Sequence, residues 1–141
     1  MIEYGSILKF KIMRDKICAV DFDGSLNKFS YPLLGEAVPG AIEGVKFLQS
    51  KGYKITLFTM RSGELLRQAV NWLKSEGVEL YGVNETPGQK EWTTSPKAYG
   101  HFYIDDAAIG CPLIYPKVGR HYVDWPKVIK IILERERMES R

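Results

Sequence analysis

Hydrophobic and polar residues divide this chain into short apolar runs and longer stretches with helical spacing. The runs at 16–21 and 54–59 are almost continuously apolar, which predicts strands that are covered on both faces. Residues 39–52 and 62–77 repeat apolar side chains every three or four positions, which predicts two amphipathic helices. Three weaker apolar runs predict further strands, at 79–84, 101–106 and 113–116.

The ends of the predicted helices and of the chain carry their own signals. Pro39 suits the first turn of the first helix, and Gly52 and Gly77 each suit the position just after a helix. Residues 7–12 alternate apolar and charged side chains, which predicts an edge or half-exposed strand. Residues 124–141 predict a closing helix with a charged, frayed end.

The order of these elements predicts the fold class. Strands alternate with helices, which implies right-handed crossovers and an α/β fold with a doubly wound, mostly parallel sheet of about five strands. This is a Rossmann-like arrangement, and the 141 residues are most simply one domain over positions 1–141. Ligands of such sheets bind beyond the carboxyl ends of the strands, so the residues at those ends carry the functional prediction.

Polar side chains follow three of the predicted strands. Asp21 and Asp23 come after the first strand, Thr59 after the second, and Asp105 and Asp106 after the fourth. Four carboxylates that meet at one edge repel each other unless a cation lies between them. Ligands that offer only oxygen favour Mg²⁺ over Zn²⁺, and Mg²⁺ is usually shared with the phosphate oxygens of a substrate. The pattern therefore predicts a Mg²⁺ site that handles a phosphorylated compound.

Four short motifs resemble one known family. They are VDFDGSL at 20–26, LFT at 57–59, a lysine before the fourth strand, and YIDD at 103–106. In this order they resemble the haloacid dehalogenase superfamily of phosphohydrolases, and the chain looks most similar to its small capless members. The resemblance implies a Rossmann-like core without a separate cap domain. It also implies Mg²⁺-dependent hydrolysis of phosphomonoesters through an aspartyl-phosphate intermediate.

The resemblance assigns roles to the acidic residues. Asp21 would be the nucleophile and a metal ligand, and Asp23 would be the general acid and base, with its backbone carbonyl as a metal ligand. Asp105 would bind Mg²⁺ directly, and Asp106 would bind it through water or support the other ligands. Gly24 would let the chain turn sharply, so that backbone amides after Asp21 bind phosphate oxygens.

The resemblance also assigns the uncharged and basic groups. Thr59 would hydrogen-bond a phosphoryl oxygen, and Lys97 would balance the charge of the nucleophile and the transferred group. Lys90 is the alternative lysine, although its loop favours a solvated side chain. The position of Arg61, two residues after Thr59, and not the resemblance, predicts that it binds a second anionic group or a feature of the leaving group, with a surface ion pair as the alternative.

Composition bears on the partners and the cellular location of the protein more than on its chemistry. The 20 basic and 17 acidic residues give a net charge of +3 without a basic stripe, so stable nucleic-acid binding is not expected. Two cysteines without CxxC spacing, an N-terminus without a signal-peptide core and the absence of a long apolar run predict a cytoplasmic protein that does not enter a membrane. His101 and His121 have no partner at metal-ligand spacing, so we expect them to be structural or exposed.

The connections at 26–40 and 84–96 are too short to fold as a cap, which predicts an open rim with only a short flap. An open rim suits an exposed phosphate on a macromolecule, a loosely held small metabolite, or a lid supplied by a second copy in a homo-oligomer. Two other functions remain open at this point. One is a phosphotransferase that uses an acceptor other than water, and the other is a binding or regulatory module that keeps the fold without turnover.

Overall fold

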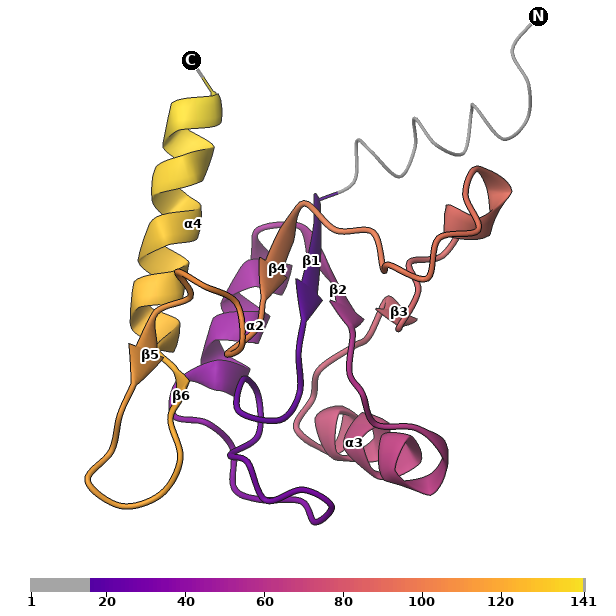
Figure 1. The fold of residues 1–141 in the computed structure, drawn as a ribbon. Helices are drawn as coiled ribbons and strands as arrows, with labels where there is room; N and C mark the ends of the chain where they lie inside the picture. The colour runs from indigo at the N-terminus through magenta and orange to yellow at the C-terminus, as the bar shows by residue number, and fades with distance from the viewer. Residues whose placement is uncertain (1–15, 141) are drawn as a thin grey trace, which may run out of the picture.

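The computed structural model describes residues 16–140 and arranges four parallel strands in one sheet (Figure 1). The strand order is β3-β2-β1-β4, with the bounds β1 (Lys16–Val20), β2 (Tyr53–Leu57), β3 (Gly82–Val83) and β4 (Phe102–Ile104). Strands β1 and β2 pair in parallel along their full length. With its flanking helices, this sheet confirms the predicted Rossmann-like α/β fold, and residues 16–140 contain no separate cap domain. The strand predicted at 7–12 lies outside the described residues.

Strand β1 forms because its residues suit a strand that is covered on both faces. Ile17, Cys18, Ala19 and Val20 are all fully buried. Both faces of the strand are therefore packed, as a continuous apolar run requires. Since β1 lies between β2 and β4, the residues that follow it are placed at the centre of one sheet edge.

The helices are α2 (Ala41–Ser50), α3 (Gly63–Ser75) and α4 (Trp125–Glu139), with a short 3₁₀ helix η1 (Gln89–Glu91). Helix α2 packs against β2 and against α4 (Figure 1). No helix within residues 16–140 is both long enough and apolar enough to cross a membrane.

The predicted helix ends are mostly confirmed. Gly52 and Gly77 adopt positive φ angles of 94° and 81° directly after the last capping residues of α2 and α3. This left-handed conformation favours glycine, which explains why both helices stop there. The prediction for Pro39 is wrong, because Gly40 is the N-cap of α2 and the proline precedes it.

The fifth predicted strand does not join the main sheet. Strand β5 (Leu113–Ile114) pairs in an antiparallel manner with β6 (Tyr122–Val123) and forms a separate two-stranded sheet. The chain returns after β5 as a hairpin, so β5 pairs with β6 and not with β4. The backbone amide of Val123 donates a hydrogen bond of 3.0 Å to the carbonyl of Gly24, so this hairpin contacts the loop that follows β1.

Candidate active site

Three carboxylates meet at the carboxyl ends of two neighbouring strands. Asp21 follows β1, and Asp105 and Asp106 follow β4. A backbone hydrogen bond of 2.9 Å from the amide of Asp21 to the carbonyl of Ile104 holds the two strand ends together. One carboxylate oxygen from each aspartate lies within 4.8 Å of the others, which is close enough for all three to bind one metal ion.

A buried serine links the two halves of this carboxylate group. The Ser25 hydroxyl donates to Oδ2 of Asp21 at 2.9 Å and accepts from the backbone amide of Asp106 at 3.1 Å. The Ser25 carbonyl accepts a hydrogen bond of 2.7 Å from Nε1 of Trp125, the first residue of α4. Ser25 is completely buried, so water does not compete for these bonds. The serine therefore fixes Asp21 relative to Asp106.

Electrostatics show how strongly this arrangement favours a cation. Burial raises the pKa of Asp21 from 3.8 to about 8, and the negative charge of Asp105 adds to the rise. Without a cation, the pocket thus favours the protonated form of the residue predicted to be the nucleophile. The donors are all carboxylate oxygens, which fit Mg²⁺.

Gly24 leaves room for this group of acids. A Cβ atom added at Gly24 would lie 2.5 Å from Oδ2 of Asp106, and the backbone of Gly24 has a φ of 86°. Both facts exclude a larger residue without local movement. The sharp turn predicted at Gly24 therefore lets the loop after β1 approach the loop after β4 closely.

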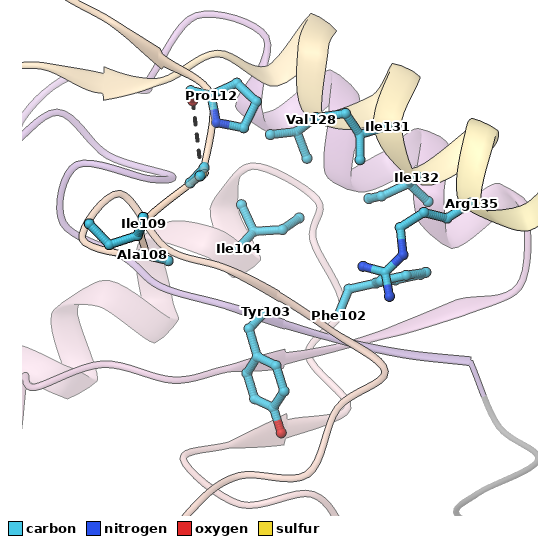
Figure 2. Close-up of a pocket in the computed structure, with 12 residues that line it drawn as sticks. Phe102, Tyr103, Ile104, Ala108, Ile109, Pro112, Val128, Ile131, Ile132 and Arg135 are labelled. Carbon is cyan, nitrogen blue, oxygen red and sulfur yellow. Dashed lines mark hydrogen bonds between the residues drawn. The ribbon is translucent and has the colours of Figure 1, made fainter.

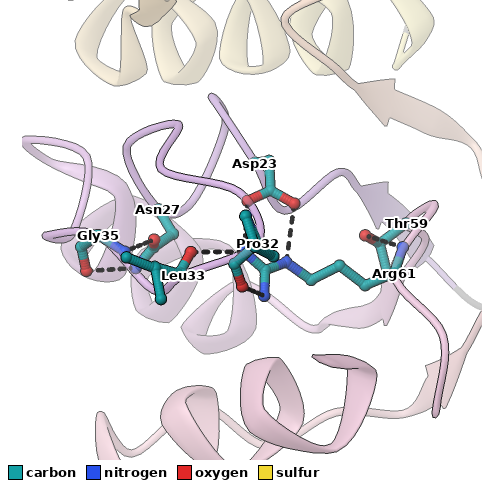
Figure 3. A network of polar contacts seen from close by, with 7 residues as sticks. All are labelled: Asp23, Asn27, Pro32, Leu33, Gly35, Thr59 and Arg61. Carbon is teal, nitrogen blue, oxygen red and sulfur yellow. Dashed lines mark hydrogen bonds and ion pairs between the residues drawn. The ribbon is translucent and has the colours of Figure 1, made fainter. Parts of the chain in front are cut away.

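The side chain of Asp23 points away from the three carboxylates and toward Arg61. The Arg61 guanidinium donates two hydrogen bonds of 2.8 Å to Asp23, from Nε to Oδ2 and from Nη2 to Oδ1 (Figure 3). The side chain of Arg61 is only 1% exposed, so this is a buried ion pair and not the surface pair considered from the sequence. The guanidinium expected to contact a substrate is instead held by Asp23 in this structure.

A cavity of about 470 Å³ opens beside the carboxylates. Its polar lining consists of Asp21, Thr59, Asn84, Lys97 and Asp105. Its apolar lining consists of Phe58, Met60, Pro96 and Ala98. The cavity thus combines charged groups with an apolar wall, as small-molecule sites commonly do.

The structure separates the two candidate lysines. Lys97 lines the cavity, and its ammonium lies 5.0 Å from the centre of the Tyr103 ring. Lys90 instead pairs with Glu85 at 3.4 Å and is exposed. Lys97 therefore lines the same cavity as Asp21, whereas Lys90 lies in a surface ion pair.

Thr59 is held in place by its neighbours. Its backbone amide donates to Oδ1 of Asn84 at 2.7 Å, and its hydroxyl accepts from the backbone amide of Arg61 at 3.1 Å. Asn84 has a φ of 57°, which asparagine tolerates better than most residues. Asn84 was not among the site residues predicted from the sequence, although it directly follows β3 and so has the same strand-end signal as Asp21.

His121 is a second residue that sequence reasoning did not place at the site. Its Nε2 lies 3.1 Å from Oδ2 of Asp106, and its ring contacts Tyr115 at 5.5 Å. The side chain is 25% exposed, and its partner is a residue of the site. No spacing signal links His121 to Asp106, because the β5–β6 hairpin brings them together.

A separate apolar pocket lies between β4 and α4 (Figure 2). Its volume is about 220 Å³, and its wall includes Ile104, Val128, Ile132 and Arg135. None of the predicted site residues lines this pocket, which separates it from the carboxylate group.

Comparison with known proteins gives one extensive match. No family model matches the chain, and no curated protein matches it. A solved structure of a conserved protein from Bacteroides thetaiotaomicron shares 32% identity and a TM-score of 0.72, over 86% of this chain and 93% of the other. The D,D-heptose 1.7-bisphosphate phosphatase of B. bronchiseptica, solved with magnesium and phosphate, shares 19% identity over 48% of each chain, with a TM-score of 0.38. The second likeness is too limited to carry an argument.

Proposed function

This chain belongs to the same family as the conserved protein from Bacteroides thetaiotaomicron, and we propose that it is a Mg²⁺-dependent phosphomonoester hydrolase of the haloacid dehalogenase type. The observation that carries the proposal is the meeting of Asp21, Asp105 and Asp106 within 4.8 Å. Two of them, Asp21 and Asp105, line a cavity whose wall also includes Thr59 and Lys97. Carboxylates for a hard cation next to a hydroxyl and an ammonium form a set that suits a phosphoryl group.

In the first step, a carboxylate oxygen of Asp21 attacks phosphorus. A bond forms between that oxygen and phosphorus, while the bond from phosphorus to the leaving oxygen breaks. Asp23 gives its proton to the leaving oxygen, which departs as an alcohol. Asp23 is suited to this role because its carboxylate lies apart from the group of three and is held in a fixed direction by Arg61.

In the second step, a water molecule attacks the phosphorus of the aspartyl phosphate. Asp23, now a carboxylate, takes a proton from the water as the new oxygen–phosphorus bond forms. The bond between phosphorus and Asp21 breaks, and inorganic phosphate is released. Both aspartates return to their starting protonation states, so the cycle balances.

The cavity residues support the transferred group. Lys97 supplies positive charge, and Thr59 supplies a hydroxyl for a phosphoryl oxygen. The Asn84 side chain accepts from Thr59 through Oδ1, which leaves its NH₂ group to donate toward the cavity. Asp21, Asp105 and Asp106 would hold Mg²⁺, with Asp23 offering its backbone carbonyl. When bound, the ion would neutralise charge on the nucleophile and the phosphate.

The apolar wall of the cavity lies where a leaving group would be placed. The apolar wall includes Phe58 and the almost fully exposed Met60, so the cavity accepts a leaving group with an apolar part. This wall is compatible with a small phosphorylated metabolite and with an exposed phosphate on a macromolecule.

The test is hydrolysis of p-nitrophenyl phosphate by the wild type and by Asp21→Asn, with and without Mg²⁺. We expect turnover that requires Mg²⁺ and that is lost in Asp21→Asn. Glu43→Gln is the matched control, because Glu43 is an exposed acid on α2, and it should keep wild-type turnover. Turnover that persists in Asp21→Asn contradicts the assigned nucleophile. A wild type that neither binds Mg²⁺ nor hydrolyses any phosphomonoester contradicts the function itself.

A further inference from the structure

Arg61 is a charged side chain at a position where charge is normally avoided. It is 1% exposed and ranks among the largest fully buried side chains of the described residues. A buried guanidinium is tolerated only when it is paired and its N–H groups find acceptors. The bidentate pair with Asp23 meets the first requirement.

Two of the three remaining N–H groups of Arg61 bind the flap, which we define as residues 28–35. Nη2 donates to the carbonyl of Leu33 at 2.9 Å, and Nη1 approaches the carbonyl of Pro32 at 3.4 Å (Figure 3). The ring of Tyr31, also from the flap, lies 5.3 Å from the guanidinium carbon. One buried side chain therefore contacts both Asp23 and the turn of the flap.

The base of the flap is fixed independently. The side chain of Asn27 donates to the carbonyl of Gly35 at 2.9 Å and accepts from the amide of Gly35 at 2.6 Å. Asn27 is completely buried, which protects both bonds from water. The flap is thus closed at its base by Asn27 and attached at its turn by Arg61 (Figure 3).

From these contacts we infer that Arg61 is a positioning residue that holds the Asp23 carboxylate and the flap in one working arrangement. This inference rests on the proposed function, in which Asp23 transfers the proton. A carboxylate offers about four acceptor positions, and the two bonds to Arg61 leave others free to carry that proton. The paired geometry fixes the direction of those free positions, and a fork of two parallel bonds does so better than a single contact.

This role has a signature that a purely structural role lacks. Proton transfer to the leaving oxygen matters most when the leaving group is a strong base, such as an alkoxide, and little for p-nitrophenolate. Loosening Asp23 therefore slows hydrolysis of an alkyl phosphate more than that of p-nitrophenyl phosphate. A general loss of folded protein lowers both rates by the same factor.

The experiment compares kcat/KM for glycerol phosphate and for p-nitrophenyl phosphate in the wild type, Arg61→Gln and Arg61→Lys. We expect the ratio of alkyl to aryl rates to fall roughly 10-fold or more in Arg61→Gln, toward the value of Asp23→Asn. Arg61→Lys keeps the charge but not the fork, so its ratio should lie between the two. Arg67→Gln is the matched control, because Arg67 is exposed on α3 and pairs with Glu64. Its ratio should equal that of the wild type.

Two further results complete the test. Adding Arg61→Gln to Asp23→Asn should leave the ratio unchanged, because the group that Arg61 positions is already inactive. If Arg61→Gln does not fold, the ratio of alkyl to aryl rates is compared between Arg61→Lys and the wild type. An unchanged ratio in the folded Arg61 variants, together with an altered ratio in Asp23→Asn, overturns the inference and leaves the proposed function intact. Failure of the proposed function is recognised separately, by wild-type turnover that does not depend on Asp21.

Discussion

Replacing the proposed nucleophile should stabilise the metal-free protein. Burial, with the charge of Asp105, raises the pKa of Asp21 from 3.8 to about 8. Between these two values the folded protein holds a proton at Asp21 that the unfolded chain has released. The free energy of unfolding therefore decreases as pH rises. The stabilisation that the raised pKa of Asp21 gives to the folded protein is complete below about pH 4. It is lost as the pH rises through about 8. The Asp21→Asn variant has no charge to bury at this position, so its free energy of unfolding does not decrease for this reason at any pH.

The structure sets an upper limit on the effect. A rise from 3.8 to about 8 corresponds, at about 1.4 kcal/mol per pKa unit, to at most roughly 6 kcal/mol. Asparagine has nearly the same shape, and its carbonyl oxygen still accepts the hydrogen bond from Ser25. We therefore expect Asp21→Asn to be more stable than the wild type by about 2 kcal/mol or more at pH 8 without metal. The melting temperature should rise by roughly 2–4 °C per kcal/mol.

The assay is urea unfolding followed by circular dichroism at pH 5 and pH 8, with EDTA and with Mg²⁺. In EDTA the wild type should lose stability from pH 5 to pH 8 relative to Asp21→Asn. Mg²⁺ at 100 times its dissociation constant should raise the unfolding free energy of the wild type by about 2.7 kcal/mol, because the ion binds only the folded state. Glu43→Gln, an exposed change, should follow the wild type. Equal stability of Asp21→Asn and wild type at pH 8 in EDTA refutes the reasoning, as does a wild type that gains stability relative to Asp21→Asn.

Three further outcomes follow from the same site. Gly24→Ala would bring a methyl group to 2.5 Å from Oδ2 of Asp106, in a left-handed backbone conformation. We expect titration calorimetry to show weaker Mg²⁺ binding, and the unfolding free energy to fall by about 1–3 kcal/mol. Lys97→Met should lower kcat/KM for p-nitrophenyl phosphate by about 100-fold, whereas Lys90→Met, in a surface ion pair, should leave it unchanged; equal effects would contradict the choice of lysine. Asp23→Asn leaves a buried guanidinium without its carboxylate, so urea unfolding should show a loss of about 3–5 kcal/mol, and a change below 1 kcal/mol would contradict the buried pair.

The positions of Asp21 and Asp105 were predictable because their signals are local. A strand covered on both faces appears as an unbroken apolar run, and a carboxylate directly after it stands out. The same strand-end signal applies to Thr59, and its extension to β3 would have found Asn84. The parallel arrangement of the main sheet was predictable because strands that alternate with helices favour parallel pairing, whereas the strand order was not predicted.

Two contacts between side chains from distant loops were not predictable. The pair between Arg61 and Asp23 joins residues 38 positions apart, and no periodicity encodes it. The approach of His121 to Asp106 depends on a hairpin whose strands are two residues long. Strand β5 lies within the run predicted at 113–116, but its partner β6 was not predicted, because two residues show no period.

The hydrogen bond between Trp125 and Ser25 couples the start of α4 to the loop that follows β1. The indole at the start of α4 donates to the carbonyl of the serine that holds Asp21, and Trp125 is almost fully buried. Any opening of the loop after β1 must break this bond or move the indole into water. Local unfolding of the reactive loop and fraying of the first turn of α4 should therefore be one cooperative event, with shared amide protection in hydrogen exchange. Helix α4 should therefore belong to the same cooperative unit as β1.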